Sequence, residues 1–231
     1  MFSYYGSKSK IVDYYPPPKF NKIIEPFAGS ARYALKYFDR DILLVDKYEI
    51  VVSMWKWLQS CSEKDILGLP DYNPKEPFSN TLSENERMLV AFNCNRGGAT
   101  PKNVAGGYDN VKSVWKHRKK EIAKSLFKIK HWQIKLGCYK EIENIEATWF
   151  IDPPYQFGGE HYKESNKNIN FTELAKWCKE RTGQIIVCEN TKADWLPFKK
   201  MIDISGQSQK TTEAIWSNNI TNYDNVQMSL L

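Results

Sequence analysis

The sequence predicts an α/β fold, with an open sheet flanked by helices and a mostly helical insertion. Short apolar runs of strand type alternate with amphipathic helical patterns along the chain. The run at residues 148–151 stops at Asp152, Pro153, Pro154 and Tyr155, because neither proline can donate to a sheet ladder. A long polar and basic stretch separates this run from the first two predicted strands.

Composition limits the class of protein. A chain of 231 residues is long enough for one α/β domain with an insertion and short for two full domains. Hydrophobic content of 42% excludes a disordered chain. No stretch has the apolar length of a membrane span, and the N-terminus lacks a signal-peptide pattern, so we expect a cytoplasmic protein. The five cysteines are scattered, with no C-x-x-C spacing, which favours reduced thiols over a disulfide framework or a zinc site.

Positive charge is concentrated in one segment. Nine Lys or Arg and a single acid, Glu121, lie within residues 111–135, so this segment carries +8 in a chain whose net charge is +6. A local basic face of this kind is expected where a protein contacts phosphates. A lysine-rich, solvated helix surface is the alternative interpretation.

The first strands are predicted near the N-terminus. Residues 22–30 predict a short buried strand, a glycine turn and the start of a helix that reaches about residue 38. Residues 41–46 predict a second strand that ends in Asp46, 21 positions after Glu25. At this spacing α/β nucleotide folds place a carboxylate that accepts from ribose hydroxyls, and a helix N-cap role for Asp46 is compatible with it. A nicotinamide-cofactor domain would also need a G-x-G-x-x-G turn, which is absent from the sequence.

The remaining elements follow from periodicity and caps. Helices are predicted over residues 48–61, from a capping box at Ser83 and Glu86 to residue 93, over 110–130 and over 170–181. Residues 67–80 contain three prolines and predict a loop, and the polar residues 156–168 predict a mobile flap. Strands are predicted over residues 184–188 and near 213–218. We expect Trp115 and Trp132 to be core residues.

Four short motifs resemble those of the Dam-like DNA adenine-N6 methyltransferases. Asp152-Pro153-Pro154-Tyr155 resembles the catalytic motif of amino-methyltransferases, in the Asp form typical of the adenine enzymes. Tyr4, Gly6 and Lys8 match an N-terminal Tyr-x-Gly-x-Lys motif. The cofactor motif Glu-Pro-Phe-x-Gly-x-Gly is matched by residues 25–29, with Ala31 in place of its last glycine. Residues 95–98 resemble an Asn-Arg-x-Gly block.

The resemblance implies a Rossmann-like, S-adenosylmethionine-dependent methyltransferase sheet. It implies a catalytic core at residues 1–54 and 145–231 and an insertion at 55–144 that carries target-recognition elements, interleaved with some core elements. The residues implied to bind the cofactor are Tyr4, Gly6, Lys8, Glu25, Pro26, Phe27, Ala28, Gly29, Ser30, Asp46 and Asp152. The candidates for DNA contact are Arg96, Lys102, Lys116, Arg118, Lys119 and Lys120. For Arg96 a helix cap in a surface loop is the alternative.

The resemblance also implies a mechanism. Asp152 and the Pro153 carbonyl would accept the two hydrogens of the adenine amino group, Tyr155 would stack on the base, and no metal is required. This interpretation requires Asp152 to face the cofactor cleft and not to be held in a buried ion pair. Transfer to cytosine N4 or RNA adenine, and a catalytically silent DNA-binding homologue, are the alternatives. The sequence leaves open the oligomeric state and the existence of a restriction endonuclease counterpart.

Overall fold

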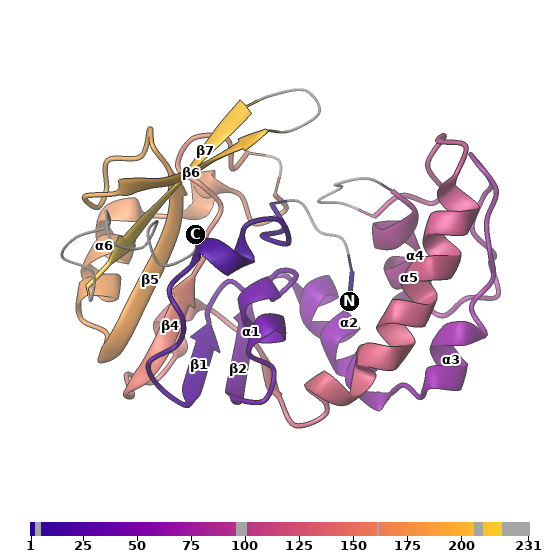
Figure 1. The fold of residues 1–231 in the computed structure, drawn as a ribbon, viewed down its shortest axis with the longest axis horizontal. Coiled ribbons are helices and arrows are strands. Elements are labelled where there is room, and N and C mark those ends of the chain that lie inside the picture. The colour runs from indigo at the N-terminus through magenta and orange to yellow at the C-terminus, as the bar shows by residue number, and fades with distance from the viewer. Residues whose placement is uncertain (3–5, 96–100, 161, 206–209, 219–231) are drawn as a thin grey trace.

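The computed structural model describes residues 1–2, 6–95, 101–160, 162–205 and 210–218 (Figure 1). Tyr4 and Arg96, which the sequence predicts to bind the cofactor and DNA, lie outside the described residues. Within the described residues, a sheet lies beneath a short N-terminal segment, and a group of helices extends to one side (Figure 1).

A seven-stranded sheet forms the centre of the described structure, in the order β3-β2-β1-β4-β5-β7-β6. The strands are β1 (Lys22–Glu25), β2 (Asp41–Asp46), β3 (Gln133–Leu136), β4 (Ala147–Ile151), β5 (Gly183–Asn190), β6 (Lys199–Ser205) and β7 (Lys210–Ser217). The strands from β3 to β5 are parallel, whereas β7 is antiparallel to both β5 and β6. The order 3-2-1-4-5 is that of a doubly wound sheet. The predicted α/β class is therefore confirmed, and the sheet is consistent with a Rossmann-like methyltransferase fold.

The central strand β4 is buried on both faces, which explains its uninterrupted apolar sequence. Trp149 and Ile151 join a core on one face together with residues of α6 (Phe171–Lys179). Phe150 points to the other face and stacks on Tyr33, with ring centroids 4.3 Å apart. Helices on both faces thus hold the end of β4 in a fixed position.

The other helices lie on the opposite side of the sheet from α6. Some of them pack on the face to which Phe150 points, and the rest lie farther from the sheet. These helices are α1 (Arg32–Lys36), α2 (Glu49–Ser60), α3 (Glu63–Leu67), α4 (Glu84–Cys94) and α5 (Val111–Ser125). Short 3-10 turns occur at Val12–Tyr14, Leu126–Ile129, Tyr139–Glu141 and Asn166–Asn168, and Tyr139 joins the core on the α6 face. The predicted capping box is confirmed, because Ser83 and Glu86 each accept from the other's backbone N–H. Trp115 and Trp132 are buried, as predicted.

Helices α3 and α4 each pack on α5 and form with it a helical lobe, the described residues within 62–125, at one end of the molecule (Figure 1). Trp115 of α5 is fully buried there, and its indole N–H donates to the carbonyl of Pro70 at 2.8 Å. Helix α4 also packs on α2. The lobe is therefore continuous with the helical layer of the sheet.

Three elements depart from the sequence prediction: α3, β3 and β6 were not predicted. Strand β3 lies within residues 55–144, the range predicted to be an insertion, yet it pairs with β2 as part of the sheet. It is the terminal strand of the sheet and only Ile134 of its four residues is buried, so it lacks an apolar run. Residues 55–144 thus include a strand of the sheet, and the predicted division into core and insertion stays a prediction.

Candidate functional site

A cavity of about 280 Å³ lies at the carboxyl ends of β1, β2 and β4. The chain passes from β1 outward to β2 and β3 and then returns to β4 on the other side of β1. Ligands of open α/β sheets bind at such a switch point, outside the carboxyl ends of the strands. Backbone topology therefore places the cavity where the sequence analysis expects a ligand.

The cavity brings together residues that are far apart in the sequence. It is lined by each predicted cofactor-binding residue that the structure describes: Gly6, Lys8, Glu25, Pro26, Phe27, Ala28, Gly29, Ser30, Asp46 and Asp152. Of the predicted catalytic turn, Asp152 and Pro154 line it, whereas Pro153 is buried and Tyr155 contacts Lys8 instead. The predicted cofactor roles remain predictions.

The turn between β1 and α1 has unusual backbone geometry. Gly29 has φ +44° and Ala31 has φ +45° and ψ +49°, so both adopt the left-handed conformation. This conformation favours glycine, because a Cβ approaches the following carbonyl. Ala31 stands where the resembling motif has its last glycine, and the structure shows that the turn keeps a glycine-like backbone despite the substitution.

Asp46 joins two of the loops around the cavity. Its Oδ2 accepts from the backbone N–H of Gly29 at 2.9 Å, and its Oδ1 accepts from the backbone N–H of Tyr48 at 2.8 Å. Burial raises the pKa of Asp46 to about 6, although these two hydrogen bonds lower it. The carboxylate therefore fixes the β1–α1 turn next to the end of β2.

Glu25, at the end of β1, is a buried carboxyl group beside the cavity. Its Oε1 accepts from the backbone N–H of Ala34 at 2.6 Å. Burial raises the pKa of Glu25 to about 8, and the charge of Asp152 raises it further. Between its ordinary pKa of 4.5 and pH 8, the folded chain retains a proton that the unfolded chain has lost.

The free energy of unfolding should therefore fall as pH rises from 4.5 to about 8. Glu25→Gln should remove the part of this fall that is due to the Glu25 carboxyl group. We expect the variant to gain free energy of unfolding relative to the wild type between pH 4.5 and pH 8. The amide oxygen can still accept from Ala34. Urea unfolding of both proteins across this range measures the difference, and parallel pH dependences of the two curves would contradict the assignment.

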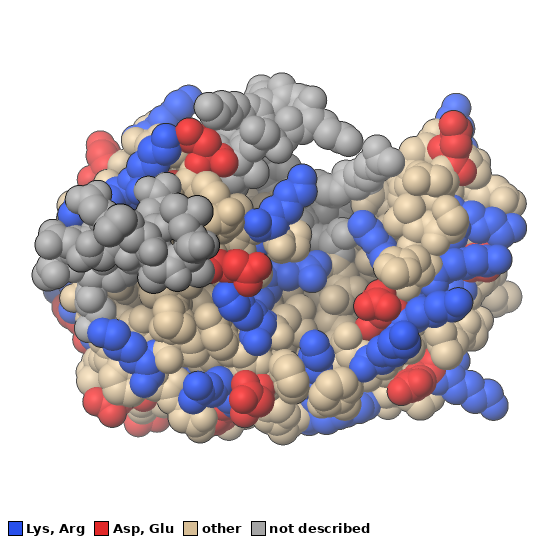
Figure 2. Space-filling view, in the orientation of Figure 1, with Lys and Arg blue, Asp and Glu red and all other residues tan. Residues whose placement is uncertain are grey.

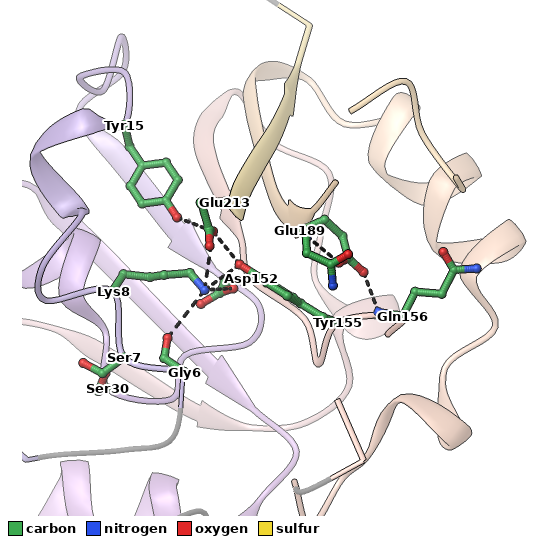
Figure 3. A network of polar contacts seen from close by, with 11 residues as sticks. Gly6, Ser7, Lys8, Tyr15, Ser30, Asp152, Tyr155, Gln156, Glu189 and Glu213 are labelled. Carbon is green, nitrogen blue, oxygen red and sulfur yellow. Dashed lines mark hydrogen bonds and ion pairs between the residues drawn. The ribbon is translucent and has the colours of Figure 1, made fainter. Parts of the chain in front are cut away.

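Asp152 belongs to a polar network beneath the cavity (Figure 3). Lys8 Nζ lies 2.9 Å from Asp152 Oδ1 and 3.6 Å from Glu213 Oε1, and it donates to the Tyr155 hydroxyl at 2.7 Å. The Tyr15 hydroxyl donates to the same Glu213 oxygen at 2.6 Å. The Tyr155 hydroxyl also donates to this oxygen. Burial lowers the pKa of Lys8, but the two carboxylates outweigh burial and hold it well above its usual range. Lys8 is therefore a cation shared by two acids.

The ion pair is a correction to the sequence analysis, which required Asp152 to be free of a buried pair. The Asp152 side chain is 22% exposed and lines the cavity, whereas Lys8 is almost fully buried. The carboxyl group therefore borders the cavity while its Oδ1 is paired with Lys8. Burial raises the pKa of Asp152 to about 6, with Lys8 lowering it and Glu213 raising it.

Glu213 and Tyr15 were not among the predicted site residues. Glu213 lies on β7 and is 4% exposed, and Tyr15 follows the Val12–Tyr14 turn and is 2% exposed. The sequence signal for Glu213 is an acid inside a strand, because an ionised group in that position needs partners. The sequence around Tyr15 contains no comparable signal that would predict a role at the site.

The predicted flap at residues 156–168 forms one side of the cavity. Tyr162 and Glu164 line it, and Glu164 Oε2 lies 3.3 Å from Lys47 Nζ across the cavity rim. A Cβ at Gly6, which has φ +70°, would collide with the Tyr162 hydroxyl. A glycine at position 6 thus permits the N-terminal segment and the flap to meet.

The predicted DNA-contacting residues of α5 divide into two groups. Lys116 and Lys120 are exposed, as is Lys102 in the loop before the helix. Lys119 is 7% exposed, and its Nζ donates to the Leu69 carbonyl at 2.6 Å and pairs with Asp71 at 2.8 Å. This position is a correction, because a phosphate cannot reach a side chain enclosed by its own lobe.

Arg118 is half-buried, and its Nη1 donates to the Asn93 carbonyl at 2.9 Å.

The outer face of α5 carries an exposed lysine at every fourth position. These four residues are called the lysine stripe: Lys112, Lys116, Lys120 and Lys124. Figure 2 shows Lys and Arg side chains gathered over the helical lobe. Four helical residues advance about 6 Å, so the stripe spans about 18 Å.

The described residues contain no cluster of three or more His, Cys, Asp or Glu able to hold a metal ion. None of the described helices is long and apolar enough to cross a membrane. All five cysteines are free.

Comparison with known proteins gives little guidance. No protein-family model and no curated protein matches the chain. Its fold is similar to that of yhhF from Escherichia coli, provisionally described as a methyltransferase, with a TM-score of 0.37, 8% identity and coverage of 91% of this chain and 78% of that one. It is also similar to HI0767 from Haemophilus influenzae, provisionally described as a methylase, with a TM-score of 0.37, 10% identity and coverage of 85% and 78%. These values are too low to assign an activity.

Proposed function

We propose that this protein is an S-adenosylmethionine-dependent methyltransferase that acts on the exocyclic N6 amino group of a flipped-out adenine in DNA. One observation carries the proposal. The Asp152 carboxylate, at the end of β4, lines the same cavity as the Gly29 turn and Asp46. An acceptor for an amino group and the elements expected to hold an adenosyl cofactor therefore share one space.

The residues around the cavity fit the cofactor chemically. Asp46 is positioned to accept from ribose hydroxyls, since each carboxylate oxygen retains a lone pair after its backbone hydrogen bond. Phe27 and Tyr139, with ring centroids 5.4 Å apart, supply an aromatic wall suited to a purine. When bound, the cofactor supplies a methyl group on a sulfonium.

Asp152 orients and activates the amino group. The amino nitrogen of adenine is a poor nucleophile because its lone pair is delocalised into the ring. A carboxylate oxygen that accepts an amino hydrogen draws electron density toward the nitrogen and stabilises the positive charge that develops there. With a pKa of about 6, Asp152 is ionised at neutral pH and able to take the proton that the methylated nitrogen releases.

The lysine stripe is consistent with a DNA substrate. A base in a duplex cannot enter a cavity of this kind unless it leaves the stack, and the protein must then hold the surrounding backbone. Four exposed ammonium groups on one helix face offer contacts to consecutive phosphates. Lys116 pairs with Asp71 at 3.4 Å, but such an exposed pair is weak and can exchange for a phosphate.

The direct test combines the purified chain with methyl-labelled S-adenosylmethionine and unmethylated duplex DNA, single-stranded DNA or RNA. The product is digested to nucleosides and the labelled one is identified. We expect labelled N6-methyl-2′-deoxyadenosine from duplex DNA. Label on cytosine N4 or only in RNA would redirect the substrate assignment, and absence of label with intact cofactor binding would remove the proposal.

A further inference from the structure

Glu213 occupies a central place in the polar network although it does not line the cavity. It comes from β7, whereas its partners come from the N-terminal segment and from the turn after β4 (Figure 3). Its Oε1 accepts from Tyr15 and Tyr155 and lies 3.6 Å from Lys8 Nζ. Glu213 therefore shares two partners with the network around Asp152, namely Lys8 and Tyr155, and no direct hydrogen bond joins the two acids among the contacts described above.

The network holds two carboxylates and one ammonium group. Burial is the largest cause that holds the pKa of both Tyr15 and Tyr155 well above the usual value, and the charges of Glu213 and Asp152 add to it, so both phenols are neutral donors. The position of the single ammonium group then decides how far each acid is neutralised. Lys8 lies closer to Asp152, at 2.9 Å, than to Glu213, at 3.6 Å, and Glu213 is compensated by the two phenols.

We propose that Glu213 is a positioning residue that acts through Lys8: it retains part of the ammonium charge and so keeps the Asp152 carboxylate basic and accessible to the substrate. Without the charge of Glu213, Lys8 would be free to neutralise both oxygens of Asp152. The amino group of the substrate would then have to displace an ammonium ion from a partly buried carboxylate. The role in catalysis rests on the proposed function, whereas the charge balance does not.

Several other titratable groups face Asp152, so each variant of the test changes one of them at a time. They are Lys8 from the N-terminal segment, Tyr15, Glu25 at the end of β1, Tyr155, Cys188 and Glu189 on β5, and Glu213 on β7. Glu213→Gln changes one of these and preserves its shape, because an amide oxygen can still accept from both phenols.

The experiment follows the titration of Asp152 in full-length protein with ¹³C-labelled Asp side chains, its signal being identified by its loss in Asp152→Asn. We expect a wild-type midpoint near 6 and a lower midpoint in Glu213→Gln, because a carboxylate that raises the pKa of Asp152 has been removed. Tyr15→Phe removes a donor from Glu213, which then attracts Lys8 more strongly, so the midpoint should rise. An unchanged midpoint in Glu213→Gln, or shifts of the same sign in both variants, would overturn the proposal.

These titrations need no turnover, so they separate this inference from the proposed function. If methyl transfer is observed, Glu213→Gln should lower kcat about 10-fold and leave the affinity for S-adenosylmethionine unchanged. The acid limb of its pH profile should move to lower pH. An unaltered profile with reduced cofactor affinity would indicate a merely structural role. Opposite midpoint shifts without any methyl transfer would support the positioning role and refute the enzyme assignment.

Discussion

Asp152→Asn is expected to lower the rate of methyl transfer by about 10²- to 10⁴-fold and to weaken cofactor binding far less. The amide keeps the size of the side chain, but it loses the charge that stabilises a positive nitrogen and cannot accept the proton. Labelled transfer to duplex DNA measures the rate, and calorimetric titration with S-adenosylmethionine measures binding. Asp109→Asn, at an exposed position beside the helical lobe, is the matched control. A variant at position 152 that transfers methyl groups like the wild type would remove the proposed role.

The same carboxyl group sets the expected pH dependence. Burial raises the pKa of Asp152 to about 6, and the proposed mechanism requires its ionised form. Activity should therefore be full at neutral pH and fall as the pH decreases through about 6. A rate that stays constant down to pH 5, with the protein folded, would show that the ionised carboxylate is not required.

Replacement of the lysine stripe is expected to weaken DNA binding on the order of 10²-fold at moderate salt. The variant is Lys112→Gln, Lys116→Gln, Lys120→Gln and Lys124→Gln combined. If each lysine neutralises one phosphate, the slope of log affinity against log salt should fall by about 3 to 4. Fluorescence anisotropy with a labelled duplex over a range of salt concentrations measures both quantities, in the absence of cofactor.

A second quadruple variant controls for net charge. It changes four exposed lysines that lie away from α5: Lys19, Lys176, Lys179 and Lys192. Both variants lose four positive charges, so an equal loss of affinity would reflect the overall charge of the protein. A loss confined to the stripe variant would locate the phosphate contacts on α5.

The strands of the sheet could be predicted where an apolar run of residues ends at an acid or a proline. Strand β2 and its terminal Asp46 were predicted with the observed bounds, and β4 to within one residue, because acids and prolines end these strands. Strands β3 and β6 were missed for a physical reason. Each lies toward an edge of the sheet, and β3 buries only Ile134, so no run of apolar residues distinguishes it from a loop.

The residues around the cavity could be predicted where they lie at strand ends, since the carboxyl ends of parallel strands share an edge. The network behind them could not. Tyr15 and Glu213 are separated by 198 positions, and only the antiparallel insertion of β7 between β5 and β6 brings them together. Lys119 shows the same limit, because its partner Asp71 lies in a loop whose path the sequence does not specify.

The position of β7 in the sheet has a consequence for the order in which the protein can become active. The polar network joins Lys8, Asp152 and Glu213, and the strand that supplies Glu213 is the last one among the described residues. A domain generally folds as a unit, and synthesis begins at its N-terminus. A nascent chain that has reached β5 already contains the glycine turn, Asp46 and Asp152, but it lacks the acid that balances Lys8. Full activity would thus arise only after the end of the sheet has left the ribosome.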